Sequence, residues 1–239
     1  MTIVLFDIDG TLVTTGGGAR RAFGRALCEA AGRPISPDGH SFSGRTDPQI
    51  ARDILAAHGL AGADLETAIP EAIRLYLRYF EELLGSRREQ VEVLPGVRPL
   101  LERLGGVPEV RVALLTGNVE PGARLKLGAP GLVHHFDFSL SCFGSDDADR
   151  YRLPALALER ARRVLGREVP GGRLVLVGDS EHDVLCGRSI GARAVAVCTG
   201  WTPADKLRAL RPHALLQDLS DTERALAALL DGPARPGAP

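Results

Sequence analysis

The sequence predicts an α/β protein with a Rossmann-like, doubly wound parallel sheet and an inserted all-helical domain. Short segments rich in Val and Leu alternate with helical patterns over residues 93–230. Each apolar segment is bounded by Gly, Pro or Asp, as expected for strands that helices cover on both faces. One long stretch near the N-terminus breaks this alternation, because helical patterns follow one another there without a strand between them.

Five apolar segments are expected to form the sheet: Thr2–Phe6, Arg111–Leu115, Phe136–Leu140, Arg173–Val177 and Ala192–Val197. Asp137 and Ser139 interrupt the third of them, and His213–Leu216 is a candidate for an additional edge strand. Apolar periodicity predicts the helices between them, which are Val97–Leu104, Pro121–Leu127, Leu153–Leu165, Glu181–Ile190, Ala204–Leu210 and Thr222–Leu230.

The stretch without strands contains three helical patterns: Ala19–Ala31, Pro48–His58 and Leu65–Leu84. We expect residues 16–91 to form a helical cap domain, and residues 1–15 and 92–239 to form the α/β core. The two hinges would be the glycine-rich Thr14–Gly18 and Glu92–Gly96. The Pro/Gly-rich tail, Gly232–Pro239, is expected to fray.

Composition excludes several classes of function. The 239 residues carry a formal net charge of -1 with acids and bases mixed along the chain, so no basic stripe predicts a nucleic-acid partner. No apolar run approaches the length of a membrane span, and the N-terminus lacks the pattern of a signal peptide. The four cysteines are scattered without a CxxC pair, which favours reduced thiols in the cytoplasm over disulfides or a zinc site.

Acidic residues follow the first expected strand, in Asp7-Ile8-Asp9-Gly10-Thr11. Asp7 and Asp9 can point into one site if the chain leaves the strand conformation there, and Gly10 permits such a turn. Two close carboxylates repel each other and need a cation or a shared proton. A hard metal such as Mg²⁺, which prefers oxygen ligands, supplies that cation. The alternative is an ordinary Asx-rich turn at a strand end.

Two further motifs stand at strand ends, where ligands bind in open parallel sheets. Asp179 and Asp183 lie one helical turn apart after the strand ending at Val177, so both can reach one point, although helix capping would also explain them. Thr116-Gly117-Asn118 offers a hydroxyl and exposed backbone N–H groups, which can bind an anion. Simple capping is again the alternative for this third motif.

Together these motifs resemble the haloacid dehalogenase superfamily, in particular its phosphoglycolate-phosphatase-like members with a helical cap. The resemblance covers nearly the whole chain and rests on five segments in order: the DxDGT of Asp7–Thr11, Gly44-Arg45-Thr46-Asp47 in the cap, Leu94-Pro95-Gly96-Val97 at the return to the core, Thr116 in LLTGN, and the GDxxxD of Gly178–Asp183. It implies a haloacid-dehalogenase-like fold and a Mg²⁺-dependent phosphatase that acts on a small phosphorylated metabolite.

The resemblance also implies a role for each site residue. Asp7 would attack phosphorus and form an aspartyl-phosphate, while Asp9 would act as general acid and base. Asp7, the Asp9 carbonyl, Asp179 and Asp183 would hold Mg²⁺ or its waters. Thr116 would bind phosphate oxygens. The remaining substrate-binding residues would be Gly10, Thr11, Arg45, Gly117, Asn118 and Lys126.

One position departs from the family pattern, because no lysine stands before the strand that carries the fourth motif. The matching region reads Asp149-Arg150-Tyr151-Arg152-Leu153-Pro154. Arg150 is the favoured replacement, with Arg152 and Lys126 as the other candidates; each could also be an exposed solubilising charge. In the cap, Arg45 could face the substrate and would suit a second anionic group such as a carboxylate.

Other functions remain open at this stage. A phosphomutase of the β-phosphoglucomutase type would keep the same motifs, and a non-catalytic Mg²⁺-binding interaction domain would keep the acidic cluster. A phosphonate hydrolase is disfavoured because residues 16–90 contain no lysine for a Schiff base. A dehalogenase is disfavoured because that branch of the family lacks an acid at the position of Asp9. The protein is expected to be a monomer or homodimer.

Overall fold

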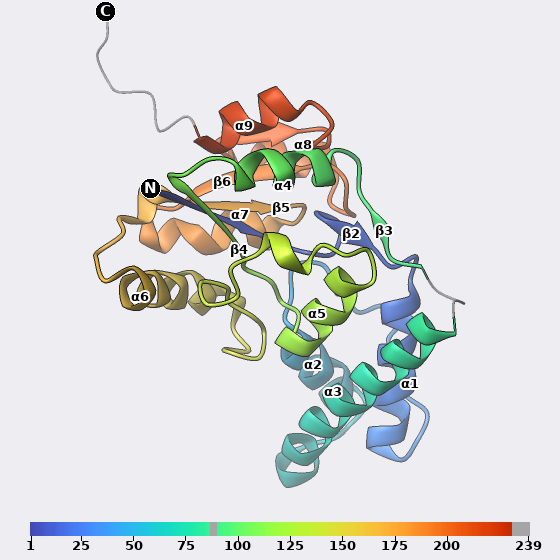
Figure 1. Cartoon of the computed structure of the whole chain (residues 1–239). Helices are drawn as coiled ribbons and strands as arrows, with labels where there is room; N and C mark the ends of the chain where they lie inside the picture. Colours follow the sequence, from blue (N-terminus) through green and yellow to red (C-terminus); the bar gives the residue numbers. More distant parts are fainter. Residues whose placement is uncertain (87–89, 231–239) are drawn as a thin grey trace, which may run out of the picture.

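A five-stranded parallel sheet lies at the centre of the computed structural model, which describes residues 1–86 and 90–230 (Figure 1). Its strand order is β4-β1-β5-β6-β7, and every neighbouring pair is parallel. The strands are β1 (Thr2–Phe6), β4 (Val110–Leu114), β5 (Leu174–Gly178), β6 (Arg193–Val197) and β7 (Ala214–Leu216). The chain adds β4 on one side of β1 and β5 on the other, so the order reverses at β1. In such sheets the binding crevice lies at the carboxyl ends of the strands beside this reversal.

Alternating side chains of the strands supply separate hydrophobic clusters on the two faces of the sheet. Val4 and Phe6 of β1 belong to the cluster under α4, α5 and α9, whereas Ile3 and Leu5 belong to the cluster with α6. Figure 1 shows α4 and α9 together on one side of the sheet and α6 and α7 on the other. The bounds of the core helices are α4 Val97–Gly105, α5 Glu120–Gly128, α6 Leu153–Leu165, α7 Glu181–Cys186, α8 Ala204–Ala209 and α9 Thr222–Leu230.

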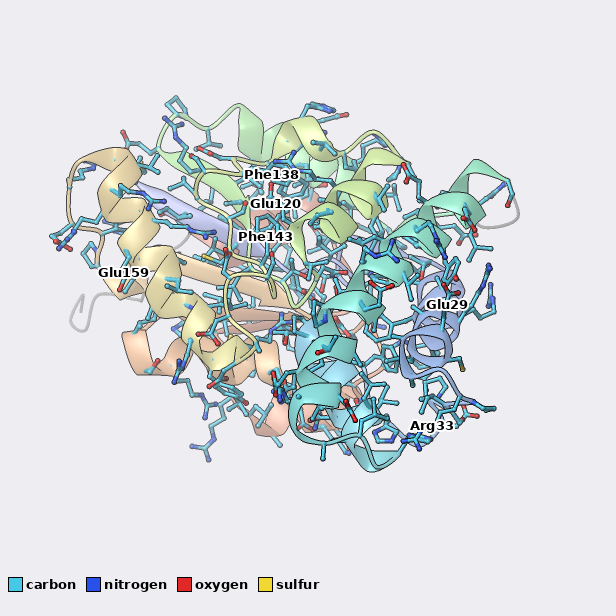
Figure 2. The ribbon with its side chains drawn as sticks, turned by 90° about the horizontal axis from the view of Figure 1, so that it is seen from below. Glu29, Arg33, Glu120, Phe138, Phe143 and Glu159 are labelled. Carbon is cyan, nitrogen blue, oxygen red and sulfur yellow. The ribbon has the colours of Figure 1, made fainter. Side chains whose placement is uncertain are left out.

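Three helices, α1 (Gly18–Ala31), α2 (Asp47–Ala57) and α3 (Gly62–Gly85), pack on one another away from the sheet (Figure 1). They share their own hydrophobic cluster, distinct from those of the sheet. In Figure 2, Glu29 and Arg33 lie on this helical unit, well separated from Glu159 on α6. The separate cluster supports our proposal that residues 16–91 form a cap domain.

The two connections between this unit and the sheet pair with each other. β2 (Val13–Thr14) and β3 (Glu92–Val93) form a short antiparallel ladder, and Leu94 N–H donates to the Leu12 carbonyl at 3.0 Å. Both segments lie at or next to the expected hinges, but no apolar pattern predicted that they would form strands. The ladder holds together the two chain segments that lead into and out of the helical unit.

The expected strand Phe136–Leu140 does not form. A 3₁₀ helix occupies Val133–His135, and the chain then turns. The Asp137 carboxylate accepts hydrogen bonds from the backbone N–H and the hydroxyl of Ser139, which is the local Asx pattern that competes with a strand. One isolated bridge, between Leu115 and Cys142, continues the sheet here. Figure 2 shows Phe138 and Phe143 close together in this loop, where their rings stack at 5.9 Å.

The other expected elements form, with most bounds shifted by one to three residues. The helix expected over Glu181–Ile190 is α-helical only through Cys186 and continues as a 3₁₀ helix over Gly187–Ile190. Two more 3₁₀ helices cover Arg150–Arg152 and Gly171–Arg173. The tail, Gly232–Pro239, lies outside the described residues. Within residues 1–86 and 90–230, none of the helices has the length and apolarity that crossing a membrane requires.

Candidate active site

Three neighbouring strands end at one point and bring the predicted motifs together. Asp7 directly follows β1, and its N–H donates to the Val177 carbonyl of β5 at 2.8 Å. Asp179 directly follows β5, and Thr116 follows β4 on the other side of β1. The parallel arrangement therefore places the three motifs at the same edge of the sheet, as the sequence predicted.

Three buried carboxylates form the centre of this site. Asp7, Asp179 and Asp183 are 6%, 3% and 4% exposed, and one carboxylate oxygen of each lies within 4.8 Å of the others. Burial raises the pKa of Asp7 to about 6, against the opposing charge of Arg150. Burial, reinforced by repulsion from Asp183 and Asp7, raises the pKa of Asp179 to about 8. A divalent cation would relieve this repulsion, and three hard oxygen donors fit Mg²⁺.

Two glycines allow the backbone to approach the Asp179 carboxylate closely. A Cβ on Gly10, whose φ is 77°, would lie 2.8 Å from the Asp179 carboxyl carbon, and a Cβ on Gly200 would lie 1.7 Å from one of its oxygens. The Thr11 hydroxyl donates to Asp179 at 3.3 Å, and Thr199 donates to the Gly10 carbonyl at 2.6 Å. Thr11 therefore faces a carboxylate of the cluster. Thr199 and Gly200 were missed from the sequence, which carries no motif at that position.

Arg150 lies between two of the carboxylates. Its Nη2 is 3.2 Å from Asp7 Oδ1 and also pairs with Asp183, and the side chain is only 3% exposed. It reaches the site from the 3₁₀ helix that precedes α6. Arg152, by contrast, is 71% exposed and pairs with Asp147. Of the two arginines, Arg150 is thus the one that contacts Asp7.

Asp9 lies apart from the acidic cluster and is bound by Lys126 and Asn118. Lys126 Nζ is 2.8 and 2.7 Å from the two Asp9 carboxylate oxygens, and it also donates to Asn118 Oδ1 at 2.6 Å. Asn118 Nδ2 donates to Asp9 at 2.8 Å and to the Thr116 hydroxyl at 2.9 Å. Burial disfavours the charge on Lys126, but Asp9 and the neighbouring Tyr76 and Asp47 outweigh it and raise the pKa of Lys126. Lys126 therefore touches Asp9 and not Asp7.

A segment of the helical unit is docked on the strand-end motif of β4. Asp47 N–H donates to the Gly117 carbonyl at 2.8 Å, and the Asp47 carboxylate accepts from Val119 N–H at 2.9 Å. The Thr46 hydroxyl donates to the Ala148 carbonyl at 2.6 Å. The approach is so close that a Cβ on Gly117 would lie 1.9 Å from the Arg45 carbonyl oxygen. These bonds join the helical unit to the core beside Asp7.

A cavity of about 770 Å³ extends from the site to the helical unit. The residues predicted for the site that line it are Asp7, Asp9, Gly10, Arg45, Gly117, Asn118, Lys126, Arg150 and Asp179. Thr11, Thr116 and Asp183 are buried behind them, in contact with Asp179, Asn118 and Arg150 respectively. Arg45 pairs with Asp53 within the helical unit.

Comparisons with known proteins agree with this architecture. The chain is 29% identical to a probable phosphatase, IndB, of Dickeya dadantii, over 95% of this chain and 94% of that protein. It is 25% identical to a phosphoglycolate phosphatase of Pseudomonas fluorescens, over 91% of this chain and 76% of the relative. It is 31% identical to the tyrosine-protein kinase PtkA of Mycobacterium tuberculosis, over 85% of this chain but 64% of PtkA.

A crystal structure of a hydrolase from Pseudomonas syringae has the same fold. It is 20% identical in sequence, superposes with a TM-score of 0.70, and the match covers 95% of this chain and 98% of that one. The sequence profile of the haloacid dehalogenase-like hydrolases matches residues 4–188, which include every motif residue described above. The chain therefore belongs to the haloacid dehalogenase-like hydrolase family.

Proposed function

We propose that the protein is a Mg²⁺-dependent phosphatase that hydrolyses a small phosphomonoester through an aspartyl-phosphate on Asp7. One observation carries this proposal: buried Asp7 contacts Arg150 and lies within 4.8 Å of two further carboxylates, while a second acid, Asp9, faces the same cavity. A dehalogenase has no use for that second acid, since a halide leaves without a proton. The relatives that bear the name phosphatase support the same reaction class.

The chemistry is a double displacement at phosphorus. A carboxylate oxygen of Asp7 attacks phosphorus, the bond to the leaving oxygen breaks, and Asp9 gives a proton to that oxygen. In the second step Asp9 takes a proton from water, which attacks the aspartyl-phosphate and frees Asp7 and inorganic phosphate. Lys126 and Asn118 hold the Asp9 carboxylate in the cavity, where it can serve both steps.

The buried cations and donors prepare this site for a phosphate group. Asp7, Asp179 and Asp183, with the Asp9 carbonyl, would hold Mg²⁺, and the bound ion would supply positive charge to offset that of the carboxylates and the phosphate. Arg150 adds a fixed positive charge beside Asp7 and, unlike lysine, cannot readily lose its proton. Gly117 lines the cavity at the end of β4, where its backbone N–H can bind a remaining phosphate oxygen, whereas the N–H groups of Thr116 and Asn118 donate to the Cys142 carbonyl and the Thr116 hydroxyl.

The setting that we propose is the cytoplasm. All four cysteines, Cys28, Cys142, Cys186 and Cys198, are free thiols, which supports a reducing compartment. The substrate is a small phosphorylated metabolite, and the protein acts as a monomer or homodimer.

The proposal is tested by release of inorganic phosphate from phenyl phosphate with and without Mg²⁺. We expect turnover in Mg²⁺, loss on chelation and loss in Asp7→Asn. Asp205→Asn, at an exposed aspartate on α8, is the matched control and should keep the parent rate. Unchanged turnover in folded Asp7→Asn would refute the nucleophile assignment. Phosphoryl transfer to a second sugar phosphate without release of phosphate would instead identify a mutase.

A further inference from the structure

The cavity is larger than a two- or three-carbon phosphate ester requires. Its volume is about 770 Å³, whereas pockets of about 300–1,000 Å³ hold drug-sized ligands. The phosphate group itself would occupy only the end beside Asp7 and Arg150. The remaining space lies between the helical unit and the mouth, which is the opening of the cavity to solvent. The residues that line this space therefore determine which leaving groups fit.

Those walls are mainly apolar and aromatic. Phe23, Phe42 and Tyr76 line the cavity from the helical unit, where the Phe23 ring packs on both of the others at 5.6 and 5.0 Å. Phe23 and Tyr76 are almost fully buried and make this wall rigid, while the half-buried Phe42 is the ring that offers surface to a ligand. Such a surface favours a substrate with a flat, uncharged leaving group over one with a short, strongly hydrated leaving group.

The basic side chains that line the cavity are mostly neutralised already. Lys126 and Arg150 pair with the site carboxylates, and Arg45 pairs with Asp53. Arg20 donates to the carbonyl oxygens of Pro37 and His40 and stacks over Phe42 at 4.3 Å. The carbonyl partners of Arg20 carry no charge, so beyond the phosphate end the described walls offer a second anionic group one uncompensated cation, Arg20. Arg45 lines the cavity but pairs with Asp53, and its contact with a carboxylate of the substrate stays a prediction.

Trp201 stands at the mouth of this cavity. It is one of the lining residues, yet 91% of its surface is exposed, far more than for any other large apolar side chain among the described residues. Thr199, two residues earlier, is bonded to Gly10 beside the acidic cluster. Two residues span at most about 7.6 Å between Cα atoms, so the indole stands close to the catalytic edge of the sheet. An exposed Trp there is a ready stacking surface for a planar group.

We propose that the substrate is a phosphomonoester whose leaving alcohol carries an aromatic heterocycle, as in a nucleoside monophosphate, and that Trp201 stacks on that ring. This inference rests on the proposed phosphatase activity. The phosphate lies against Asp7, the connecting sugar spans the cavity, and the ring reaches the mouth. Trp201 touches the ring and not the phosphate, so it sets specificity and leaves the chemistry to Asp7 and Asp9.

The test compares two esters with the same leaving chemistry. Adenosine monophosphate and ribose phosphate differ by the base, and kcat/KM is measured for both with Mg²⁺. Stacking of a base on an aromatic side chain predicts a preference on the order of 10-fold for the nucleotide. Trp201→Ala should remove most of that preference and Trp201→Phe should keep part of it. Val164→Ala, at an exposed apolar residue of α6, should leave the preference unchanged.

Fluorescence gives a second readout, because Trp201 is the single tryptophan in the sequence. In Asp7→Asn with Mg²⁺, adenosine monophosphate should quench the emission at concentrations where ribose phosphate does not. Equal kcat/KM for the two esters, or a preference that survives in Trp201→Ala, would overturn the inference. So would a Trp201→Ala variant that turns a dimer into a monomer with the preference intact. Failure to release phosphate from any ester would instead refute the proposed function.

Discussion

Gly117→Ala should separate the helical unit from the core without straining the backbone. The φ of Gly117 is not among the left-handed glycine values, so alanine itself is compatible with the local conformation. Its Cβ, however, would lie 1.9 Å from the Arg45 carbonyl oxygen, and the segment must retreat by about 1 Å to reach a tolerable contact. The 2.8 Å bond from Asp47 N–H to the Gly117 carbonyl then breaks. Overpacking of this kind costs about 1–3 kcal/mol.

The variant is measured by kcat/KM for phenyl phosphate and by urea unfolding. We expect a loss of stability in that range and a larger loss of kcat/KM, because Arg45 and Asp47 line the cavity and move with the segment. Gly128→Ala, at the end of the helix α5 that follows Gly117, is the matched control, since a Cβ there meets nothing within 4 Å. If Gly117→Ala matches this control in both measurements, the docked segment does not shape the site.

Further expectations concern the charges of the site. Lys126→Met removes both contacts to Asp9 and should lower kcat on the order of 10-fold or more with a smaller change in KM. Lys206→Met, at an exposed lysine on α8, is the control. Equal kcat in the two variants would contradict the role of Lys126 in positioning Asp9. Arg150→Met leaves buried Asp7 and Asp183 without a counter-charge and should cost about 3–5 kcal/mol in metal-free protein. Saturating Mg²⁺ should recover part of that loss in urea unfolding, whereas an equal loss with and without Mg²⁺ would place the metal elsewhere. Mg²⁺ should also raise the melting temperature of the parent and not of Asp179→Asn. Because the pKa is about 8 for Asp179 and about 6 for Asp7 without metal, Mg²⁺ must displace protons below pH 8. Its dissociation constant measured by calorimetry should therefore rise as pH falls from 8 to 6, and a constant value would argue against these ligands.

The catalytic edge could be predicted because it follows from local patterns. Asp7, Thr116 and Asp179 each end an apolar segment, and parallel strands carry such ends to one edge. The helices formed where apolar periodicity predicted them, as at α6, whose bounds match the expectation. Arg150 was favoured over Arg152 from its place in the motif, and burial separates the two in the structure.

What could not be predicted depends on contacts between distant residues. Lys126 and Asp9 are 117 positions apart, and nothing in either neighbourhood indicates that they meet. The Asp47 contact with Val119 and the pairing of β2 with β3 are of the same kind. The prediction of a strand at Phe136–Leu140 was wrong for the opposite reason. A local Asx turn at Asp137 formed there instead of the strand that the apolar pattern indicated. Trp201 carries no motif, and its place at the mouth emerges only from the fold.

The central claim is that Asp7 becomes phosphorylated during turnover. The most direct measurement is acid quenching of the protein during turnover of phenyl phosphate with Mg²⁺, followed by peptide mass analysis. The proposed mechanism predicts one added phosphoryl group on the N-terminal peptide that contains Asp7, and its absence in Asp7→Asn. Full turnover in the parent with no phosphorylated peptide at any quench time, or with the phosphoryl group on another residue, would contradict it.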